Sequence, residues 1–274
     1  MYPKAKKRLG QNFLVDGGVA ERIVRALGPG ADETVVEIGP GRGALTERLL
    51  ERAGRVVALE FDRDLVAYLR GRFGAHDNFT LVQADALNAD FCELVAPAAR
   101  ARVVANLPYN ISTAILQRLI SHRECVSEMV LMLQREVVER ITAGPGDAER
   151  GYLSVMVENY CEAEGLFDVP PGAFRPVPKV WSTVARLRMR PSPAVVVRDE
   201  KLLWRTVSAG FAQRRKTINN NLRGAPPDLL ARVEAAGGAS AVLAAAGVEP
   251  GRRAETLALG EWGRLADALE AGSR

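Results

Sequence analysis

Short apolar segments alternate with amphipathic ones along the first half of the chain. Five apolar runs, at 33–39, 55–60, 79–83, 101–106 and 128–134, have the length and composition of buried strands. Segments with helical spacing lie beside them, at 17–27, 44–53, 63–73, 87–95, 113–121 and 136–141. Continuous apolar strands that alternate with helices are typical of a parallel sheet covered on both faces. We therefore predict a doubly wound, Rossmann-like α/β domain.

Polar residues and a glycine mark where two of these helices begin and end. Asp16 and Ser112 stand directly before amphipathic segments, where a side-chain oxygen can accept hydrogen bonds from the first backbone N–H groups. Gly28 follows the first of these segments and is suited to the left-handed turn that ends many helices. We expect helices to start after Asp16 and Ser112 and the first one to stop at Gly28.

The pattern changes after residue 142. A helix-like segment at 152–163 is followed by 165–190, whose two ends alternate like strands around a proline-rich centre. We expect the two ends to add a hairpin-like edge to the sheet, with the centre as an exposed loop. Beyond the prolines of 190–194, segments such as 202–222 and 263–271 have helical spacing without strands. This organisation predicts a sheet domain at 1–190 and a small all-helical domain at 191–274.

Composition limits the class and the location. Of the 274 residues, 47% are hydrophobic and 26% are charged, as in a globular protein with a sizeable core. No run approaches the roughly 18 apolar residues of a membrane helix, and the basic first ten residues lack the apolar core of a secretion signal. We expect a cytoplasmic protein with no membrane partner.

The cysteines and histidines give no sign of a cross-link or a metal centre. Cys92, Cys125 and Cys161 lie far apart without a CxxC spacing, and His76 and His122 are isolated. We therefore predict neither a disulfide framework nor a zinc site.

Charge is distributed unevenly along the chain. The formal net charge is +4, with +4 in the first 15 residues, +3 in residues 191–274, and −3 between them. Basic ends on a slightly acidic body suit a protein whose ends contact phosphate groups. The alternative is that these charges only keep the surface solvated.

A glycine-rich segment joins the 33–39 strand to the next helix. Gly39, Gly41 and Gly43 permit a tight turn and close approach of a ligand to the backbone. Glu60 ends the next strand, where its carboxylate can accept both hydroxyls of a ribose. The spacing Gly39-x-Gly41-x-x-Ala44, with Glu60 downstream, also satisfies the dinucleotide fingerprint, so a dehydrogenase is an open alternative.

Asp85, just after the 79–83 strand, favours a different cofactor. The carboxyl ends of parallel strands meet at one edge of the sheet, so Asp85 would join Gly39, Gly41 and Glu60 there. One carboxylate for a ribose and one near an adenine amine suit S-adenosyl-L-methionine, which has no pyrophosphate that needs a long anion cradle. The alternative for Asp85 alone is a helix cap.

The segment Asn106-Leu107-Pro108-Tyr109 follows the 101–106 strand to the same edge. An adenine amine is a poor nucleophile because its lone pair is delocalised into the ring. The Asn106 side-chain oxygen and the Leu107 carbonyl can each accept an N–H bond from that amine and direct its lone pair at a methyl group. Pro108 stiffens the turn, and Tyr109 offers a face for stacking. We predict in-line methyl transfer to an adenine amine, driven mainly by positioning. The alternative is an ordinary turn with Tyr109 in the core.

Five motifs, in order, resemble the ribosomal RNA adenine N6,N6-dimethyltransferase family. They are LGQNFL, EIGPGRGALT, NLPYNIS, FRPVPKVWSTV and QRRKTINNNL, and the resemblance runs from about Lys7 into the helical tail. It implies S-adenosyl-L-methionine as cofactor and, as substrate, two adjacent adenosines near the 3′ end of small-subunit (16S) rRNA in a late assembly particle. It implies these site residues: Asn12 and Leu14 at the methionine side of the cofactor, Gly39 beneath it, Glu60 at the ribose, Asp85 at the adenine, Asn106 at the transfer edge, and Phe174 stacking on the base opposite Tyr109.

Basic residues supply the expected RNA contacts. Arg214, Arg215 and Lys216 form a cluster flanked by Phe211 and by the amides of 219–221, and Lys7 and Arg8 lie in the basic N-terminal arm. Such clusters suit a phosphate backbone, although a solvated surface is the common alternative. A duplex buries its adenine amines, so we expect the target in a loop or flipped out of its stack.

Two related functions stay open at this point. One is methylation of a large-subunit adenosine, as in relatives that confer antibiotic resistance. The other is a non-catalytic RNA-binding assembly factor that keeps the fold, against which the intact NLPY segment argues. We expect a monomer without a metal.

Overall fold

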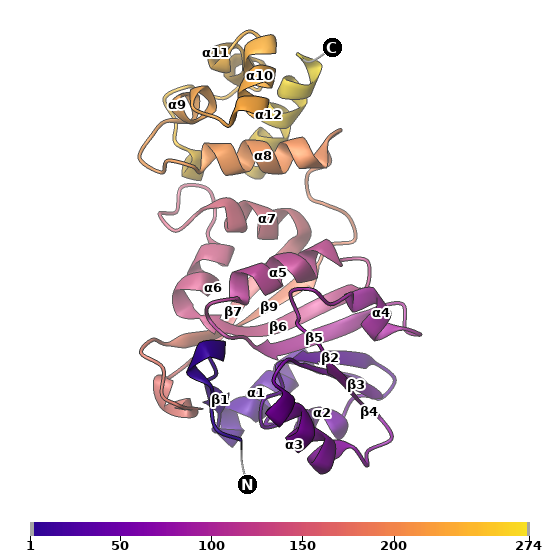
Figure 1. The fold of residues 1–274 in the computed structure, drawn as a ribbon. Coiled ribbons are helices and arrows are strands. Elements are labelled where there is room, and N and C mark those ends of the chain that lie inside the picture. Colours follow the sequence, from indigo (N-terminus) through magenta and orange to yellow (C-terminus); the bar gives the residue numbers. More distant parts are fainter. Residues whose placement is uncertain (1–2, 273–274) are drawn as a thin grey trace. The chain divides into compact units, whose positions relative to one another are not determined.

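The structure, a computed structural model, describes residues 3–272 (Figure 1). Its strands are β1 (Phe13–Leu14), β2 (Thr34–Ile38), β3 (Arg55–Glu60), β4 (Phe79–Gln83), β5 (Ala101–Asn106), β6 (Val126–Gln134), β7 (Cys161–Val169), β8 (Phe174–Arg175) and β9 (Ser182–Met189). Its α-helices are α1 (Gly17–Leu27), α2 (Thr46–Leu50), α3 (Arg63–Phe73), α4 (Phe91–Val95), α5 (Ser112–Ser121), α6 (Arg135–Thr142), α7 (Tyr152–Tyr160), α8 (Glu200–Gly210), α9 (Ile218–Arg223), α10 (Pro227–Ala235), α11 (Ala239–Ala245) and α12 (Leu259–Ala271).

The main sheet has seven strands in the order β4-β3-β2-β5-β6-β9-β7. Strands β4, β3, β2, β5 and β6 run parallel, and β9 is antiparallel to β6. The chain extends the sheet first from β2 through β3 to β4 and then from β5 outward. The direction therefore reverses between β2 and β5, which is where open α/β sheets bind ligands. The prediction of a doubly wound α/β sheet is confirmed.

Helices cover both faces of this sheet. Val35 and Val36 point to opposite faces of β2, and both are fully buried. Helices α1 and α2 join the apolar cluster that contains Val35, and α4 and α5 pack against β2 and β6. Burial on both faces explains why the strand sequences are continuously apolar instead of alternating.

The first helix begins and ends where polar and glycine signals predicted, whereas α5 does not use its expected cap. Asp16 accepts hydrogen bonds from two backbone N–H groups of α1, and Gly28 ends this helix with a φ of +58°. Ser112 is the first residue of α5, and its hydroxyl donates to the Tyr109 carbonyl at 3.2 Å. The prediction of Ser112 as a cap is therefore wrong, because the residue at the cap position is Ile111 and no side chain accepts a hydrogen bond there.

Residues 161–189 add the expected edge to the sheet, with β7 and β9 as neighbours. Helix α7 ends at Tyr160 and β7 begins at Cys161, so the helix predicted to reach residue 163 is too long. The proline-rich centre is more ordered than a simple loop, because β8 within it pairs with β1. Phe13 lies opposite Arg175, and Leu14 lies opposite Phe174.

The chain divides into two compact units. Residues up to Val138, with Glu162–Met189, form one unit, and Glu139–Cys161, with residues from Arg190 onward, form the other. The sequence placed 139–161 in the sheet domain, and the structure places them with the helices because α7 shares their apolar core. Val155 belongs to the cluster of Leu203 and Trp262. No helix within residues 3–272 is long and apolar enough to cross a membrane.

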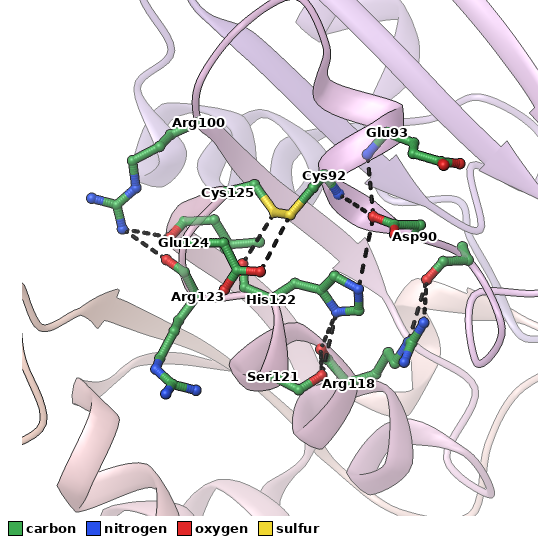
Figure 2. The surroundings of a disulfide bond; sticks show 12 residues. Asp90, Cys92, Glu93, Arg100, Arg118, Ser121, His122, Arg123, Glu124 and Cys125 are labelled. Atoms are coloured by element: carbon green, nitrogen blue, oxygen red, sulfur yellow. Dashed lines mark hydrogen bonds and ion pairs between the residues drawn. A yellow bond between two sulfur atoms is a disulfide. The ribbon is translucent and has the colours of Figure 1, made fainter.

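Cys92 and Cys125 form a disulfide, so the prediction of no disulfide is wrong (Figure 2). The two residues are 33 positions apart, and their Cα atoms are 5.3 Å apart. The fold brings the start of α4 beside the turn that follows α5, and this proximity is absent from the linear spacing. His122 is not isolated, because its ring packs edge-on against Phe91 with centroids 5.5 Å apart.

Candidate active site

A cavity of about 230 Å³ opens at the carboxyl edge of the parallel strands. Gly39 and Gly41 reach it from the end of β2, Glu60 from β3, Asp85 from β4 and Asn106 from β5. Residues 8–13 of the N-terminal segment complete its wall. The structure thus brings these five residues together at the edge where strand order reverses. It also places there five others selected from sequence, Arg8, Asn12, Leu107, Pro108 and Tyr109.

The glycine turn after β2 opens the backbone toward this cavity. Gly39 has a φ of +65°, and a Cβ built on it would meet no atom within 4 Å. Gly41 has a φ of +59°, and its Cβ would lie 3.0 Å from the Phe13 ring. A Cβ at Gly43 would overlap the Phe73 ring of α3. Gly39 therefore provides room for a ligand, while Gly43 allows close packing of a helix.

Glu60 presents an oriented carboxylate to the cavity. Its Oε1 accepts a hydrogen bond from the Asp62 N–H at 2.8 Å, and its Oε2 accepts one from the Gly41 N–H at 3.3 Å. Only 6% of the residue is exposed, and this burial raises the pKa of the carboxyl against the opposing effect of the backbone bonds. Each oxygen keeps a further lone pair that can accept a hydroxyl donor.

Asp85 both lines the cavity and shapes its own turn. Its Oδ1 accepts from the Leu87 N–H at 2.9 Å, and its Oδ2 accepts from the Asn88 side chain at 3.2 Å. Asp85 therefore caps its own turn, as the alternative predicted, and also lines the cavity. Phe61, which sequence reasoning did not select, also lines the cavity and is 57% exposed. Its position in the sequence could have indicated this role, because Phe61 is a large aromatic residue directly after the strand-end carboxylate Glu60.

Asn106 and Leu107 place two oxygen acceptors at the end of β5. The Asn106 side-chain NH2 donates to the Asn12 carbonyl at 3.0 Å, which directs the side-chain oxygen away from Asn12. Within residues 3–272, neither this oxygen nor the Leu107 carbonyl accepts a hydrogen bond from the protein. Both residues line the cavity. Together they can accept two N–H bonds from one amine.

Tyr109 lies half-buried in the wall of the cavity. Its hydroxyl shares a 2.8 Å hydrogen bond with the Ser182 hydroxyl, and burial raises the pKa of the phenol. This bond fixes the ring at its outer end, so the ring face is held in place for stacking.

Phe174 and Leu14 do not lie at this cavity. Phe174 is 1% exposed and Leu14 is 7% exposed, and both belong to an apolar cluster beside the sheet. The pairing of β8 with β1 turns the Phe174 side chain into this core, so the expectation that it stacks opposite Tyr109 does not match the structure. Leu14 instead borders a smaller, adjacent cavity. Trp181, next to Ser182, is an exposed aromatic that sequence reasoning missed.

Ionic contacts hold the N-terminal segment in place over the cavity. Lys6 Nζ lies 2.5 Å from an Asp62 oxygen and 2.7 Å from Asp64, and the Gln11 side chain donates to Asp62 at 3.0 Å. Burial opposes ionisation of Asp62, but the bonds from Lys6 and Gln11 prevail and hold its pKa below the usual value. Lys7 and Arg8 are exposed, and Arg8 reaches the cavity wall. Sequence reasoning found the basic arm but missed its carboxylate anchor.

Glu37, on β2, is a buried carboxyl beneath the site. It is 1% exposed and accepts a hydrogen bond from the Thr46 hydroxyl at 2.6 Å. Burial, with a further contribution from the nearby Glu60 charge, raises the pKa of Glu37 to about 7. The side chain therefore changes its charge near neutral pH inside the fold.

Glu37→Gln is expected to stabilise the protein at pH 8 by about 3 kcal/mol relative to its effect at pH 4.5. The folded carboxyl binds more protons than the unfolded one between the ordinary glutamate pKa of 4.5 and the raised value of about 7. In the wild type, the stability that Glu37 contributes is thus fully present below pH 4.5 and is lost as the pH rises through about 7. The glutamine amide of the variant does not titrate, so its contribution does not change with pH. Urea unfolding of both proteins at several pH values measures the difference. A difference that is constant with pH would contradict the assignment.

The basic residues Arg214, Arg215 and Lys216 lie exposed in the loop between α8 and α9. The helix predicted across 202–222 is therefore interrupted. Asn221, part of the flanking amide group, is 4% exposed and donates to the Gly210 carbonyl at 2.6 Å. It stabilises the loop from the buried side. The three cations lie on the exposed side, where the Arg214 guanidinium donates to the Ala148 carbonyl.

Comparison with known proteins finds relatives along nearly the whole chain. The model of the family described as ribosomal RNA adenine dimethylase matches residues 2–249. Proteins named ribosomal RNA small subunit methyltransferase A are 46% identical over 264 residues in Hahella chejuensis and 47% identical over 269 residues in Pseudomonas putida. These alignments cover 96% and 97% of this chain and 92% and 95% of the relatives.

Two solved structures have a similar fold along nearly the whole chain. The 23S rRNA methyltransferase ErmE has a TM-score of 0.69 and 31% identity, with 94% of this chain and 100% of that chain covered. A dimethyladenosine transferase from Plasmodium falciparum has a TM-score of 0.76 at 24% identity, with 92% and 95% covered, and supports the fold alone. From the family match and the close relatives, the chain belongs to the ribosomal RNA adenine dimethylase family.

Proposed function

We propose that this protein transfers methyl groups from S-adenosyl-L-methionine to the N6 amines of two adjacent adenosines near the 3′ end of 16S rRNA, during late assembly of the small subunit. The observation that carries the proposal is the pair of oxygen acceptors of Asn106 and Leu107 at the cavity edge. Relatives named for the small subunit are 46% and 47% identical, against 31% for the 23S enzyme ErmE, which supports the small-subunit substrate.

The cavity residues fit the proposed cofactor. The open space at Gly39 lets a ligand approach the backbone, and Glu60 can accept the two hydroxyls of a ribose. Asp85 and the exposed Phe61 both lie on the wall, and the Phe61 ring can cover an adenine ring. When bound, S-adenosyl-L-methionine supplies an electrophilic methyl group on a positively charged sulfur.

The chain's own residues supply orientation. Two N–H bonds, one to the Asn106 side-chain oxygen and one to the Leu107 carbonyl, would hold the adenine nitrogen with its lone pair toward the methyl group. Tyr109 supports the base by stacking, worth roughly 1–3 kcal/mol. The site needs no strong base, because the methylated ammonium product is acidic and loses its proton readily. Holding the reactants in line accounts for most of the acceleration.

RNA contact is assigned to the two basic segments, Lys7 with Arg8, and the loop of Arg214, Arg215 and Lys216. All five side chains are exposed cations. The helical unit would thus act as an RNA-binding domain and the sheet unit as the catalytic one. Because the adenine amine must leave its stack to reach the cavity, the contacts to phosphate would position an unpaired segment of RNA.

Replacing Arg214, Arg215 and Lys216 together with alanine should weaken RNA binding and lower its dependence on salt. Each phosphate contact contributes roughly 0.7 to the slope of log affinity against log salt for single strands, so loss of three lowers the slope by about 2. Filter binding or fluorescence anisotropy across a salt series measures it. The double variant Arg214→Lys/Arg215→Lys keeps the charge and should retain the slope. An unchanged slope in the alanine variant would place the contact elsewhere.

Mass mapping of methylated adenosines tests the function directly. The purified protein is incubated with labelled cofactor and with either ribosomal subunit, isolated from cells that lack this enzyme. The labelled RNA is then digested, and its methylated adenosines are mapped. We expect dimethyladenosine at two adjacent positions near the 3′ end of 16S rRNA. Label confined to 23S rRNA would support the large-subunit alternative, and RNA binding without label would support a non-catalytic assembly factor. Either result would overturn the proposal.

A further inference from the structure

The disulfide of Cys92 and Cys125 lies in the sheet unit, outside the cavity, and the proposed reaction does not use it. We infer that this pair is a reversible oxidation site whose state controls how firmly the adenine side of the cofactor cavity is held, and hence the affinity for cofactor. The inference rests on the proposed function only in its choice of cofactor. The chemical partner is a low-molecular-weight disulfide in one direction and a thiol in the other.

The two sulfurs differ in accessibility. Cys125 is 3% exposed, whereas Cys92 is partly exposed on the first turn of α4. The Cys92 sulfur lies 3.5 Å from a Glu124 carboxylate oxygen, and the Cys125 sulfur lies 3.4 Å from the His122 carbonyl, so each thiol has an acceptor nearby after reduction. Both states are therefore accommodated by the surrounding groups, and an incoming reagent reaches Cys92 first.

The bond joins α4 to the turn after α5 (Figure 2). The other ends of these two segments line the cavity. Helix α4 follows directly on residues 84–90, of which Asp85, Ala86 and Leu87 are wall residues. Helix α5, which leads to Cys125, follows on the NLPY segment, which forms the facing wall. The cross-link thus connects the supports of two sides of one site.

Weaker contacts join the same two segments beside the disulfide. The Arg118 guanidinium donates to the Ala89 carbonyl at 2.9 Å, and the His122 Nε2 lies 3.9 Å from an Asp90 oxygen (Figure 2). Partly exposed contacts of this kind are individually weak. Reduction would leave them in place, so the fold persists while the 84–90 segment gains freedom. A ligand that needs this segment ordered then binds less tightly.

The exchange reaction balances with the named reagent. The Cys92 thiolate attacks one sulfur of the small disulfide, forms a mixed disulfide and releases one small thiolate. The Cys125 thiolate then attacks the Cys92 sulfur, forms the internal bond and releases the second. The protein loses two electrons and two protons, and the small disulfide becomes two thiols.

Cys161 provides a built-in contrast. It lies outside the disulfide, is 1% exposed, and burial raises the pKa of its thiol to about 12. At neutral pH very little of Cys161 is therefore in the thiolate form, and a small reagent cannot reach its buried sulfur. Oxidation by a small disulfide should therefore select Cys92 and Cys125.

Metal binding is the competing use of the same residues. The ligand atoms of Cys92, Glu124 and Cys125 lie within 4.8 Å of one another. The sulfur–sulfur bond occupies both thiols, and Glu124 is exposed, which favours redox chemistry over a closed metal site. Zinc binding by the reduced protein is accordingly included as an outcome of the test.

The test uses full-length protein in two states, oxidised with glutathione disulfide and reduced with a phosphine. Alkylation and mass spectrometry establish the state of each cysteine, and calorimetry gives the Kd for S-adenosyl-L-methionine. We expect a Kd about 3–10-fold lower in the oxidised protein. The Cys92→Ser/Cys125→Ser variant should show no dependence on redox state, and Cys161→Ala should keep it. The unfolding temperature falls on reduction even for a purely structural disulfide, so the Kd is the discriminating measurement.

Three results would overturn the inference. They are an equal Kd in both states, a pair that glutathione disulfide leaves reduced, and stoichiometric zinc binding by the reduced protein that blocks oxidation. Failure to bind S-adenosyl-L-methionine in either state would instead overturn the proposed function, and the inference with it.

Discussion

Asn106→Ala is expected to lower the rate of methyl transfer by a factor on the order of 10²–10³, with little change in RNA affinity. The variant removes one of the two oxygens that we propose hold the adenine amine, so the nitrogen lone pair would no longer be directed at the methyl group. RNA affinity is expected to depend mainly on phosphate contacts, which we propose at the basic residues elsewhere on the chain. Single-turnover methylation with saturating cofactor measures the rate, and filter binding measures RNA affinity.

Asn110→Ala is the matched control for this variant. It removes the same amide from an exposed position four residues further along the same cavity wall, so it shows whether the Asn106 oxygen itself or any amide on this wall matters, and it should change the rate by less than a few-fold. The Asn106 side chain also donates to the Asn12 carbonyl, so the cofactor Kd must be measured for both variants. An Asn106→Ala enzyme with near wild-type turnover would remove the amide from the mechanism.

Gly39→Leu is expected to raise the Kd for S-adenosyl-L-methionine at least about 100-fold. Because a Cβ at this position would meet no protein atom within 4 Å, the new side chain would extend into the space that the cofactor needs. A full hydrophobic side chain in that space removes several contacts at once, and about 2.7 kcal/mol corresponds to a factor of 100. Calorimetry with the cofactor gives the Kd.

Gly247→Leu separates this steric effect from backbone strain. Gly247 lies in the helical unit with a φ of +66°, against +65° for Gly39, and a Cβ there also meets nothing within 4 Å. Both variants should lose a similar roughly 1–2 kcal/mol of stability from the left-handed backbone. Only Gly39→Leu should lose cofactor affinity. Equal affinity in the two variants would show that the glycine turn does not border the cofactor.

The parallel sheet could be predicted from sequence because its strands are marked by local composition. The range of β3, Arg55–Glu60, and that of β5, Ala101–Asn106, agree with the sequence prediction at both ends. Site residues at the carboxyl ends of the parallel strands could be predicted for the same reason, because this topology places those ends at one edge of the sheet. Glu60, Asp85 and Asn106 all line the cavity at that edge.

Features that depend on contacts between distant segments were not predictable in this way. Phe174 was expected at the cavity, but its strand pairs with Leu14, about 160 positions away, and the ring turns into the core. Cys92 and Cys125 approach because the fold brings the start of α4 beside the turn that follows α5, which no spacing rule reveals. Residues 139–161 look continuous with the sheet domain, yet the apolar face of α7 packs with the tail helices. In each case tertiary packing overrides the local signal.

The pairing of β1 with β8 has a consequence for the nascent polypeptide. Asn12 and Phe13 are translated some 160 codons before the strand partner Arg175. Until β8 emerges, the wall that they contribute lacks its strand pairing and depends on the contacts of the N-terminal segment with Asp62, Asp64 and Asn106. This wall therefore gains its full set of contacts only after β8 has been synthesised, so a truncated product that lacks β8 would carry the glycine turn and the NLPY segment with a less firmly held wall.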